Sequence, residues 1–169
     1  LARGGRGADC LARVDSVRVP DDHAAALRSA AYRCAVAVRD IDRANAIVAK
    51  GSTGLDARVM AEHAEIWLAE GAYEPALDMV TPLVTQDSKA AEVALRALQA
   101  LGREAEMATL ATKLPSNSVA RLGAAVALYN ARRYDAVLAL LPSDCAVYAG
   151  SNQELCESAR AGSVRNLGR

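Results

Sequence analysis

The amino-acid sequence predicts an all-α fold in which about four helix pairs stack as a solenoid. Apolar residues recur at spacings of three and four along most of the chain, which is typical of one face of a helix. Alanine supplies much of the 52% hydrophobic content and phenylalanine is absent, a composition that favours helices and their close approach. A turn between two apolar helices also recurs, with anchors at Ile41, Tyr73, Glu104 and Tyr134 that are 32, 31 and 30 residues apart. Such a regular period indicates a helical repeat protein.

The stretch from Gly71 to Val84 shows the repeated turn most clearly. Gly71 supplies a permissive backbone after one helix, and Pro75 suits the first turn of the next helix, where a missing N–H group costs nothing. The apolar face of that helix is formed by Tyr73, Ala76, Leu77, Val80 and Val84. Pro82 comes late in the helix, so we expect it to bend or shorten the element.

Turn and capping residues set the expected boundaries of the elements. We expect a flexible end over residues 1–7 and the second helix of an incomplete pair over residues 8–18, which indicates that the chain is part of something longer. Pro20 stops this helix, and Asp21 and Asp22 cap the next. The complete helix pairs are expected at about 22–50, 55–85, 88–114 and 118–141, within one helical repeat domain at 8–162.

The capping-box spacing of Ser151 and Glu154 predicts a last short helix at about 151–161. It is less apolar than the others, so we interpret it as the cap of the repeat array. A flexible tail is expected over residues 163–169.

Helical periodicity also predicts which side chains face the core. In the first helix of the second pair these are Val59, Met60, His63, Ala64 and Trp67. We interpret His63 as a packed core histidine. Trp67 is interpreted as a large aromatic side chain that fills the space between helices.

Charge and motif content exclude several classes of function. The chain has 20 basic and 20 acidic residues, so it lacks the basic excess of a nucleic-acid-binding protein. No apolar run reaches the length of a membrane span, which predicts no membrane insertion. No catalytic or phosphate-binding motif occurs, and the two histidines, His23 and His63, are 40 residues apart. We therefore expect neither an enzyme nor a bound cofactor or metal.

Four cysteines, Cys10, Cys34, Cys145 and Cys156, occur without any Cys-x-x-Cys pair, which argues against a zinc ribbon or a redox motif. Two interpretations stay open: four buried thiols, or two disulfides that join Cys145 to Cys156 and Cys10 to Cys34. If the cysteines pair, an exported or periplasmic location is favoured over a cytoplasmic one.

Residues 57–90 resemble the tetratricopeptide repeat, a family of paired helices. Ala64, Trp67, Gly71, Tyr73 and Ala76 stand where that family places small, aromatic, turn, aromatic and small residues. Met60 stands where the family prefers tryptophan, His63 where it prefers leucine, and the units here are about three residues shorter. The resemblance implies a right-handed α-α superhelix whose first helices line a concave groove.

Transferring the groove positions of that family gives a set of candidate partner-binding residues. They are Arg33, Arg58, Glu65, Lys89, Glu92, Arg96, Gln99, Tyr129 and Asn130. The alternative for each is a solvated charged face with salt bridges within helices, such as Glu92 with Arg96. Val93 stands where the family's clamp for a chaperone's C-terminal carboxylate needs arginine, so we do not expect that ligand.

The sequence thus predicts a scaffold that binds a protein or peptide partner, as a peptide or helix in the groove. One alternative is a module for self-association or stacking with further repeats in a larger, exported or envelope-complex protein. A second alternative is the non-catalytic helical part of an enzyme.

Overall fold

The computed structural model describes residues 4–17 and 24–168. Its α-helices are α1 (Gly4–Ser16), α2 (Ala24–Val38), α3 (Ile41–Val48), α4 (Ala57–Ala69), α5 (Tyr73–Val80), α6 (Ser88–Ala100), α7 (Glu104–Thr112), α8 (Val119–Asn130), α9 (Tyr134–Leu140) and α10 (Ser151–Asn166). Short 3-10 helices cover Thr81–Leu83 and Cys145–Val147. These residues contain no strand, so the all-α prediction is confirmed.

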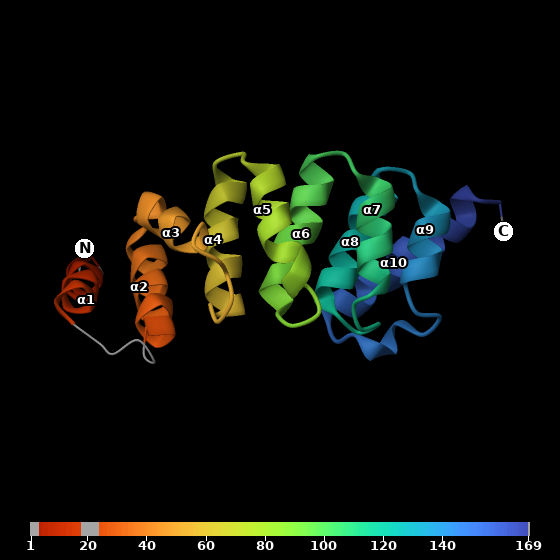
Figure 1. Ribbon diagram of the computed structural model, residues 1–169. Coiled ribbons are helices and arrows are strands. Elements are labelled where there is room, and N and C mark those ends of the chain that lie inside the picture. Colours follow the sequence, from red (N-terminus) through yellow and green to blue (C-terminus); the bar gives the residue numbers. More distant parts are fainter. Residues whose placement is uncertain (1–3, 18–23, 169) are drawn as a thin grey trace.

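The helices follow one another along an elongated row, with α1 at one end and α9 and α10 at the other (Figure 1). α4 packs against both α5 and α6, α6 against α7 and α8, and α8 against α9 and α10. The alternate helices α2, α4, α6, α8 and α10 therefore touch in sequence. Because contacts are made between near neighbours in the chain, the buried apolar residues form one core that runs along the row.

Four turns in the row have the same backbone conformation. The residues in the left-handed region are Arg39, Gly71, Gly102 and Arg132, with φ of 60°, 82°, 67° and 60°. The residue after each one donates its N–H to a carbonyl five residues earlier, at 2.9, 2.9, 2.9 and 2.8 Å. This is the hydrogen bond of the Schellman motif, which satisfies a carbonyl at the end of one helix before the next begins. The turns lie at the repeated positions that the sequence singled out.

Three expectations near the ends of the chain differ from the structure. α1 begins at Gly4, inside the segment that was expected to be a flexible end. α10 continues to Asn166, through most of the expected flexible tail, and Ser163 in this stretch is buried. Gly150, with φ of 56°, takes the N-cap position of α10, so Ser151 is the first helical residue and does not form the predicted capping box.

Proline and acidic residues elsewhere shape the helix ends. α5 ends at Val80, and Pro82 lies in the 3-10 helix that follows, which confirms that this proline shortens the element. Asp56 and Asp87 cap α4 and α6 by accepting backbone N–H groups, as acidic N-caps do. Pro20, Asp21, Asp22 and His23 lie outside the described residues.

The predicted core stripe of α4 is correct at three of its five positions, because Val59 and Trp67 are only partly buried. Met60, His63 and Ala64 are buried, whereas Trp67 is only half-buried and packs against His63 with 4.6 Å between ring centroids. The aromatic residue that is fully buried at this end of the row is Tyr32 of α2. Tyr32 lies between α2 and α4, where it contacts His63 with 5.7 Å between ring centroids.

A hydrogen bond joins α2 to α4 inside the core. The Tyr32 hydroxyl lies 3.0 Å from Nδ1 of His63, and Nε2 of His63 is buried without a partner among the described residues. Burial lowers the pKa of His63, because the surroundings cannot solvate an imidazolium ion. The neutral ring is therefore the form that the fold accommodates.

We predict that folding stability falls when pH is lowered below the usual histidine pKa. The unfolded chain takes up a proton at His63 near pH 6.5, whereas the folded chain does so only at lower pH. Between these two pKa values the unfolded state binds more protons, so the free energy of unfolding decreases by about 1.4 kcal/mol per pH unit. Urea unfolding at pH 7.5, 6.5 and 5.5 measures this slope. His63→Gln, which cannot titrate, should flatten it; an equal slope in the variant would contradict the assignment.

We further predict opposite effects for alanine at two glycines that both have free space around them. Apart from the adjoining residues and the backbone of the same helix, no atom lies within 4 Å of a Cβ built on Gly71 or on Gly123, but only Gly71 has a positive φ. Gly71→Ala should therefore lower the free energy of unfolding by about 1 kcal/mol, through the backbone alone. Gly123→Ala, inside α8, should raise it by about 0.5–1 kcal/mol. Urea midpoints that move in the same direction would show that the shared turn conformation does not govern stability.

Candidate binding groove

Two hollows open along one side of α4, α6 and α8, and together we call them the groove. The first, the apolar hollow, has a volume of about 620 Å³ and lies between α6 and α8. The second, the charged hollow, has a volume of about 470 Å³ and lies beside α2, α4 and α6. Arg96 of α6 lines both hollows, so they adjoin at this residue.

The apolar hollow has a buried floor and a low wall. It is lined by Ser88, Glu92, Leu95, Arg96, Gln99, Met107, Ser118, Val119, Ala120, Gly123 and Ala124. Leu95 and Met107 are buried, while Val119, at the start of α8, is 62% exposed. Val119 adds an apolar side chain to the rim of a concave, mostly apolar cavity, and such cavities are where ligands usually bind.

The wall formed by α8 is low because its residues on this side are small. Ala120, Gly123 and Ala124 are spaced as one helical face, and Gly123 is exposed with no atom outside its own helix within 4 Å of the position of a Cβ. Glycine inside a helix costs about 0.5–1 kcal/mol relative to alanine. Packing within this chain does not require that glycine, so the space above it is free for another molecule.

The charged hollow has three carboxylates and two guanidinium groups around an apolar floor. It is lined by Val36, Arg39, Glu62, Glu65, Ile66, Ala69, Glu70 and Arg96. Arg58, next to it on α4, lies 3.5 Å from Glu62. Because positive and negative groups are nearly balanced here, this hollow has no strong preference for a cation or an anion.

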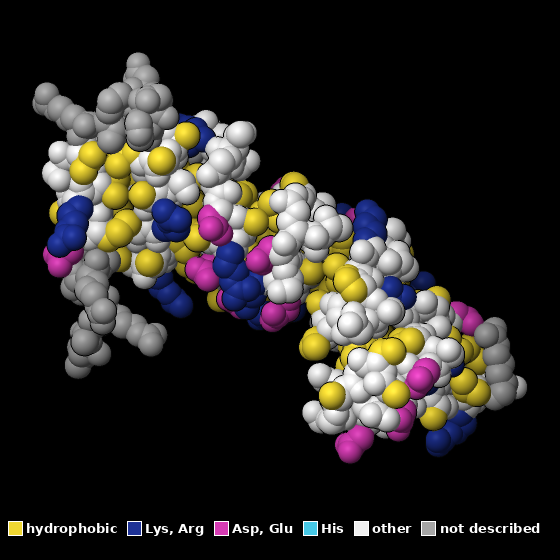
Figure 2. All heavy atoms as spheres, turned by 90° about the horizontal axis from the view of Figure 1, so that it is seen from below, with side chains coloured by type: hydrophobic (Ala, Val, Ile, Leu, Met, Phe, Trp, Pro, Cys, Tyr) yellow, Lys and Arg dark blue, Asp and Glu magenta, His cyan; other side chains and the backbone are white. Residues whose placement is uncertain are grey.

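Glu65 is the centre of an ion-pair network that links α4 to α6. Lys89 donates a hydrogen bond to its Oε1 at 2.6 Å and Arg96 donates to the same oxygen at 3.2 Å. Glu92 lies 3.8 Å from Lys89 and 4.0 Å from Arg96. The hydrogen bond from Lys89, followed by the charges of Lys89 and Arg96, lowers the pKa of Glu65. Figure 2 shows acidic and basic side chains mixed over the middle of the molecule, as this pairing requires.

The structure brings together five of the nine predicted groove residues. Glu65, Lys89, Glu92, Arg96 and Gln99 lie around the junction of the two hollows. Four of these five satisfy one another's charges. The alternative interpretation, a charged face with internal salt bridges, therefore describes these four residues correctly, although they also border the groove.

The other four predicted residues do not line the groove. Arg58 is beside it, and Arg33 and Asn130 are exposed outside either lining. Tyr129 is half-buried beneath α10: a Cβ at Gly162 would lie 2.4 Å from its hydroxyl oxygen, and Tyr134 packs edge-on against it at 5.5 Å between centroids. The floor and the α8 wall of the apolar hollow were missed by the sequence analysis; they are Leu95, Met107, Val119, Ala120, Gly123 and Ala124. The glycine inside an expected helix was the signal that could have indicated them.

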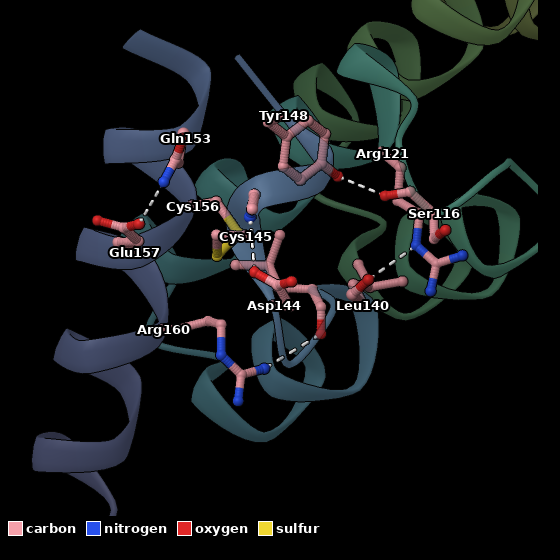
Figure 3. Close-up of a disulfide and its surroundings, with 12 residues drawn as sticks. Ser116, Arg121, Leu140, Asp144, Cys145, Tyr148, Gln153, Cys156, Glu157 and Arg160 are labelled. Carbon is pink, nitrogen blue, oxygen red and sulfur yellow. Dashed lines mark hydrogen bonds between the residues drawn. A yellow bond between two sulfur atoms is a disulfide. The ribbon is translucent and has the colours of Figure 1, made fainter. Parts of the chain in front are cut away.

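α10 closes the row by packing against α8 and α9, the neighbours that the first helix of a further pair would have. Figure 3 shows how the segment before α10 is held. Tyr148 donates its hydroxyl hydrogen to the carbonyl of Ser116 at 2.6 Å, and Arg160 donates to the carbonyl of Leu141 at 3.2 Å. Arg121 of α8 similarly bonds the carbonyl of Leu140 at 2.8 Å. The bonds to Leu140 and Leu141 satisfy carbonyl groups that the end of α9 leaves without partners.

A disulfide is placed at each end of the row. Cys145 is joined to Cys156 of α10 (Figure 3), and Cys10 of α1 is joined to Cys34 of α2; in both pairs the Cα atoms are 5.8 Å apart. These are the two pairings that the sequence suggested for an oxidising compartment. Two cysteine pairs at disulfide distance fit such a compartment.

Residues 4–17 and 24–168 contain neither a metal-ligand cluster nor a membrane-spanning helix. No group of three or more His, Cys, Asp or Glu side chains in these ranges is placed to hold a metal ion. None of the helices in these ranges combines the length and the apolar character needed to cross a membrane. Comparison of the chain with family models, with curated proteins and with solved structures found no match.

We predict that Cys145→Ala with Cys156→Ala lowers the free energy of unfolding by about 3 kcal/mol, because the bond closes a short loop, one of 11 residues in sequence separation, in the unfolded chain. Urea unfolding followed by circular dichroism measures the change. Cys10→Ala with Cys34→Ala is the comparison: its loop is longer, 24 residues in sequence separation, so the same model predicts a loss of similar or larger size. An unmoved transition in either variant would show that its disulfide does not stabilise the fold.

Proposed function

We propose that this chain is a protein-interaction module, built as a tetratricopeptide-like solenoid, that binds a segment of a partner protein in the groove. The observation that carries the proposal is the apolar hollow between α6 and α8, with its buried floor at Leu95 and Met107 and its open wall at Gly123. The repeated turns at four positions support the solenoid. Binding, not catalysis, is the proposed mechanism.

The hollow fits a large apolar side chain on a polypeptide. Its floor and the α8 wall are apolar, while Glu92, Arg96 and Gln99 are polar residues at its border. This arrangement, an apolar centre with a polar rim, is that of a protein interface. A leucine, methionine or aromatic side chain of the partner would fill the hollow, and its backbone would lie along the rim.

The surface is fixed before binding, which favours affinity. The helices that carry the hollow are held on the opposite side by the continuous core, and Arg96 is held by Glu65. Binding therefore costs conformational entropy of the partner segment, but little conformational entropy of this chain. We also propose an exported, oxidising compartment for this protein, which the two cysteine pairs support.

Charge reversal at Arg96 is a poor test of this proposal, because Arg96→Glu would also set two carboxylates, Glu65 and Glu92, beside a third. Gly123→Leu is sharper. The new side chain enters the apolar hollow, and the helix accommodates it because no atom outside α8 lies within 4 Å of the added Cβ.

We predict that Gly123→Leu lowers affinity for groove-binding peptides at least tenfold, about 1.4 kcal/mol, while the free energy of unfolding stays equal or rises by up to about 1 kcal/mol. The probes are 12-residue peptides selected from a random displayed library on the full, disulfide-bonded chain and then synthesised. Binding is measured by fluorescence polarisation of labelled peptide.

Two variants control this experiment. Gly123→Ala adds one methyl group and should retain binding. Ala139→Leu adds leucine at an exposed site of α9 outside the groove and should also retain it. If the selected peptides bind Gly123→Leu as tightly as the wild type, the apolar hollow is not the binding site. If the selection enriches no peptide, the chain does not bind peptides in the way proposed.

A further inference from the structure

A third hollow lies on the side of α4 away from the groove. It has a volume of about 370 Å³ and is lined by Val48, Ser52, Leu55, Met60, Trp67, Pro75, Asp78, Met79, Pro82 and Leu83. Met60 and Trp67 are seven positions apart on one face of α4, whereas Glu62 and Glu65 of the charged hollow lie on the other. The third hollow is therefore a separate site and does not depend on the proposed function of the groove.

The lining of this hollow is apolar with a single charge. Eight of its ten residues are aliphatic, thioether, proline or indole side chains, and Asp78 is the one ionisable group among them. Asp78 is exposed on α5, and no ion pair or side-chain hydrogen bond is formed by its carboxylate within residues 4–17 and 24–168. An unpaired carboxylate beside apolar walls favours a cation that carries an apolar stem.

The two basic side chains of the adjoining hollow do not supply that cation. Arg103 and Lys113 line the hollow on the other side of Asp78, between α5 and α7. Arg103 is already bound by Glu74 at 2.9 Å and by Glu106 at 2.6 Å. Lys113 is exposed and its ammonium is not paired with Asp78.

Trp67 adds a second attraction for a cation. Its indole packs against His63, whose ring stays neutral because burial lowers the His63 pKa, so no positive charge competes behind it. The remainder of the half-buried indole lies at the hollow. The face of an indole ring attracts ammonium and guanidinium groups within about 6 Å. The core stripe of α4 predicts a buried Trp67, yet the side chain is partly exposed. Its exposed part borders this hollow.

We propose that this third hollow is a binding site for a cationic group on an apolar stem, an alkylammonium or alkylguanidinium. The stem lies against Met60, Met79 and Leu83, and the charged end meets Asp78 and Trp67. The same chemistry is found in free alkylamines and in the lysine or arginine side chains of a protein.

Trp67 is the single tryptophan of the chain, so its fluorescence reports directly on the hollow. The full, disulfide-bonded protein is titrated at pH 7.5 with n-pentylammonium, and separately with n-pentanol, which has the same stem without the charge. We expect a saturable change in emission with pentylammonium at a concentration at least fivefold lower than with pentanol. Equal midpoints for the two probes, or no saturable change with pentylammonium, would overturn the proposal.

Asp78→Asn keeps the shape of the side chain and removes its charge, so it should abolish the difference between the two probes. Asp78→Lys replaces the carboxylate with an ammonium group that repels the ligand, so it should eliminate saturable binding of pentylammonium. Asp42→Asn, at an exposed site on α3 outside the lining, is the matched control and should behave as wild type. An undiminished preference for pentylammonium in Asp78→Asn would contradict the role of the carboxylate.

A final titration distinguishes the two sources of the ligand. The peptide Gly-Gly-Lys-Gly-Gly and its norleucine counterpart are compared with pentylammonium under the same conditions. Tighter binding of the lysine peptide than of pentylammonium assigns the site to a protein side chain, and the reverse order assigns it to a free organic cation. A norleucine peptide that binds as tightly as the lysine peptide would overturn the proposal.

Discussion

The reversal of the chain at the end of each first helix depends on one backbone conformation. A residue with positive φ breaks the helix, and the hydrogen bond that follows it directs the chain back along its neighbour. Gly71 and Gly102 adopt this conformation without strain, whereas Arg39 and Arg132 adopt it at a cost of about 1–2 kcal/mol each. The packing of the paired helices must exceed that cost, so the core and the turns stabilise each other.

The same reversal divides the surface of the row into two sides with different chemistry. The first helices face the groove, where Glu65, Lys89 and Arg96 pair across α4 and α6 and an apolar hollow follows. The opposite side of α4 carries Trp67 above a hollow with one unpaired carboxylate, Asp78. One helix therefore serves two sites, because residues three and four apart share a face and residues two apart do not.

Periodicity predicted the helices and most of the core because both follow from local spacing. The four turns, the buried stripe at Met60, His63 and Ala64, and the effect of Pro82 were all visible in the sequence. The ends were harder, because the local sequence does not reveal the burial of Ser163. Tyr129 was misplaced for a related reason: it is covered by α10, whose close approach at Gly162 is a tertiary contact.

The site was predicted less well than the fold. The sequence predicted charged residues as the partner-binding positions, yet Glu65, Lys89, Glu92 and Arg96 form ion pairs with one another. The apolar hollow depends instead on small side chains and on the distance between α6 and α8, which no single residue encodes. The free space above Gly123 could be recognised only when all its neighbours were in place.

A row of helices that touch mainly their neighbours has a weakness that a globular core lacks: each terminal helix has a neighbour on one side only and opens most easily. Here the first helix is bound covalently to the second, and the last to the segment that precedes it. The fraying that would otherwise start at the tips is suppressed. Separation of α1 from α2, and of α10 from the segment before it, therefore depends on the redox potential of the surroundings.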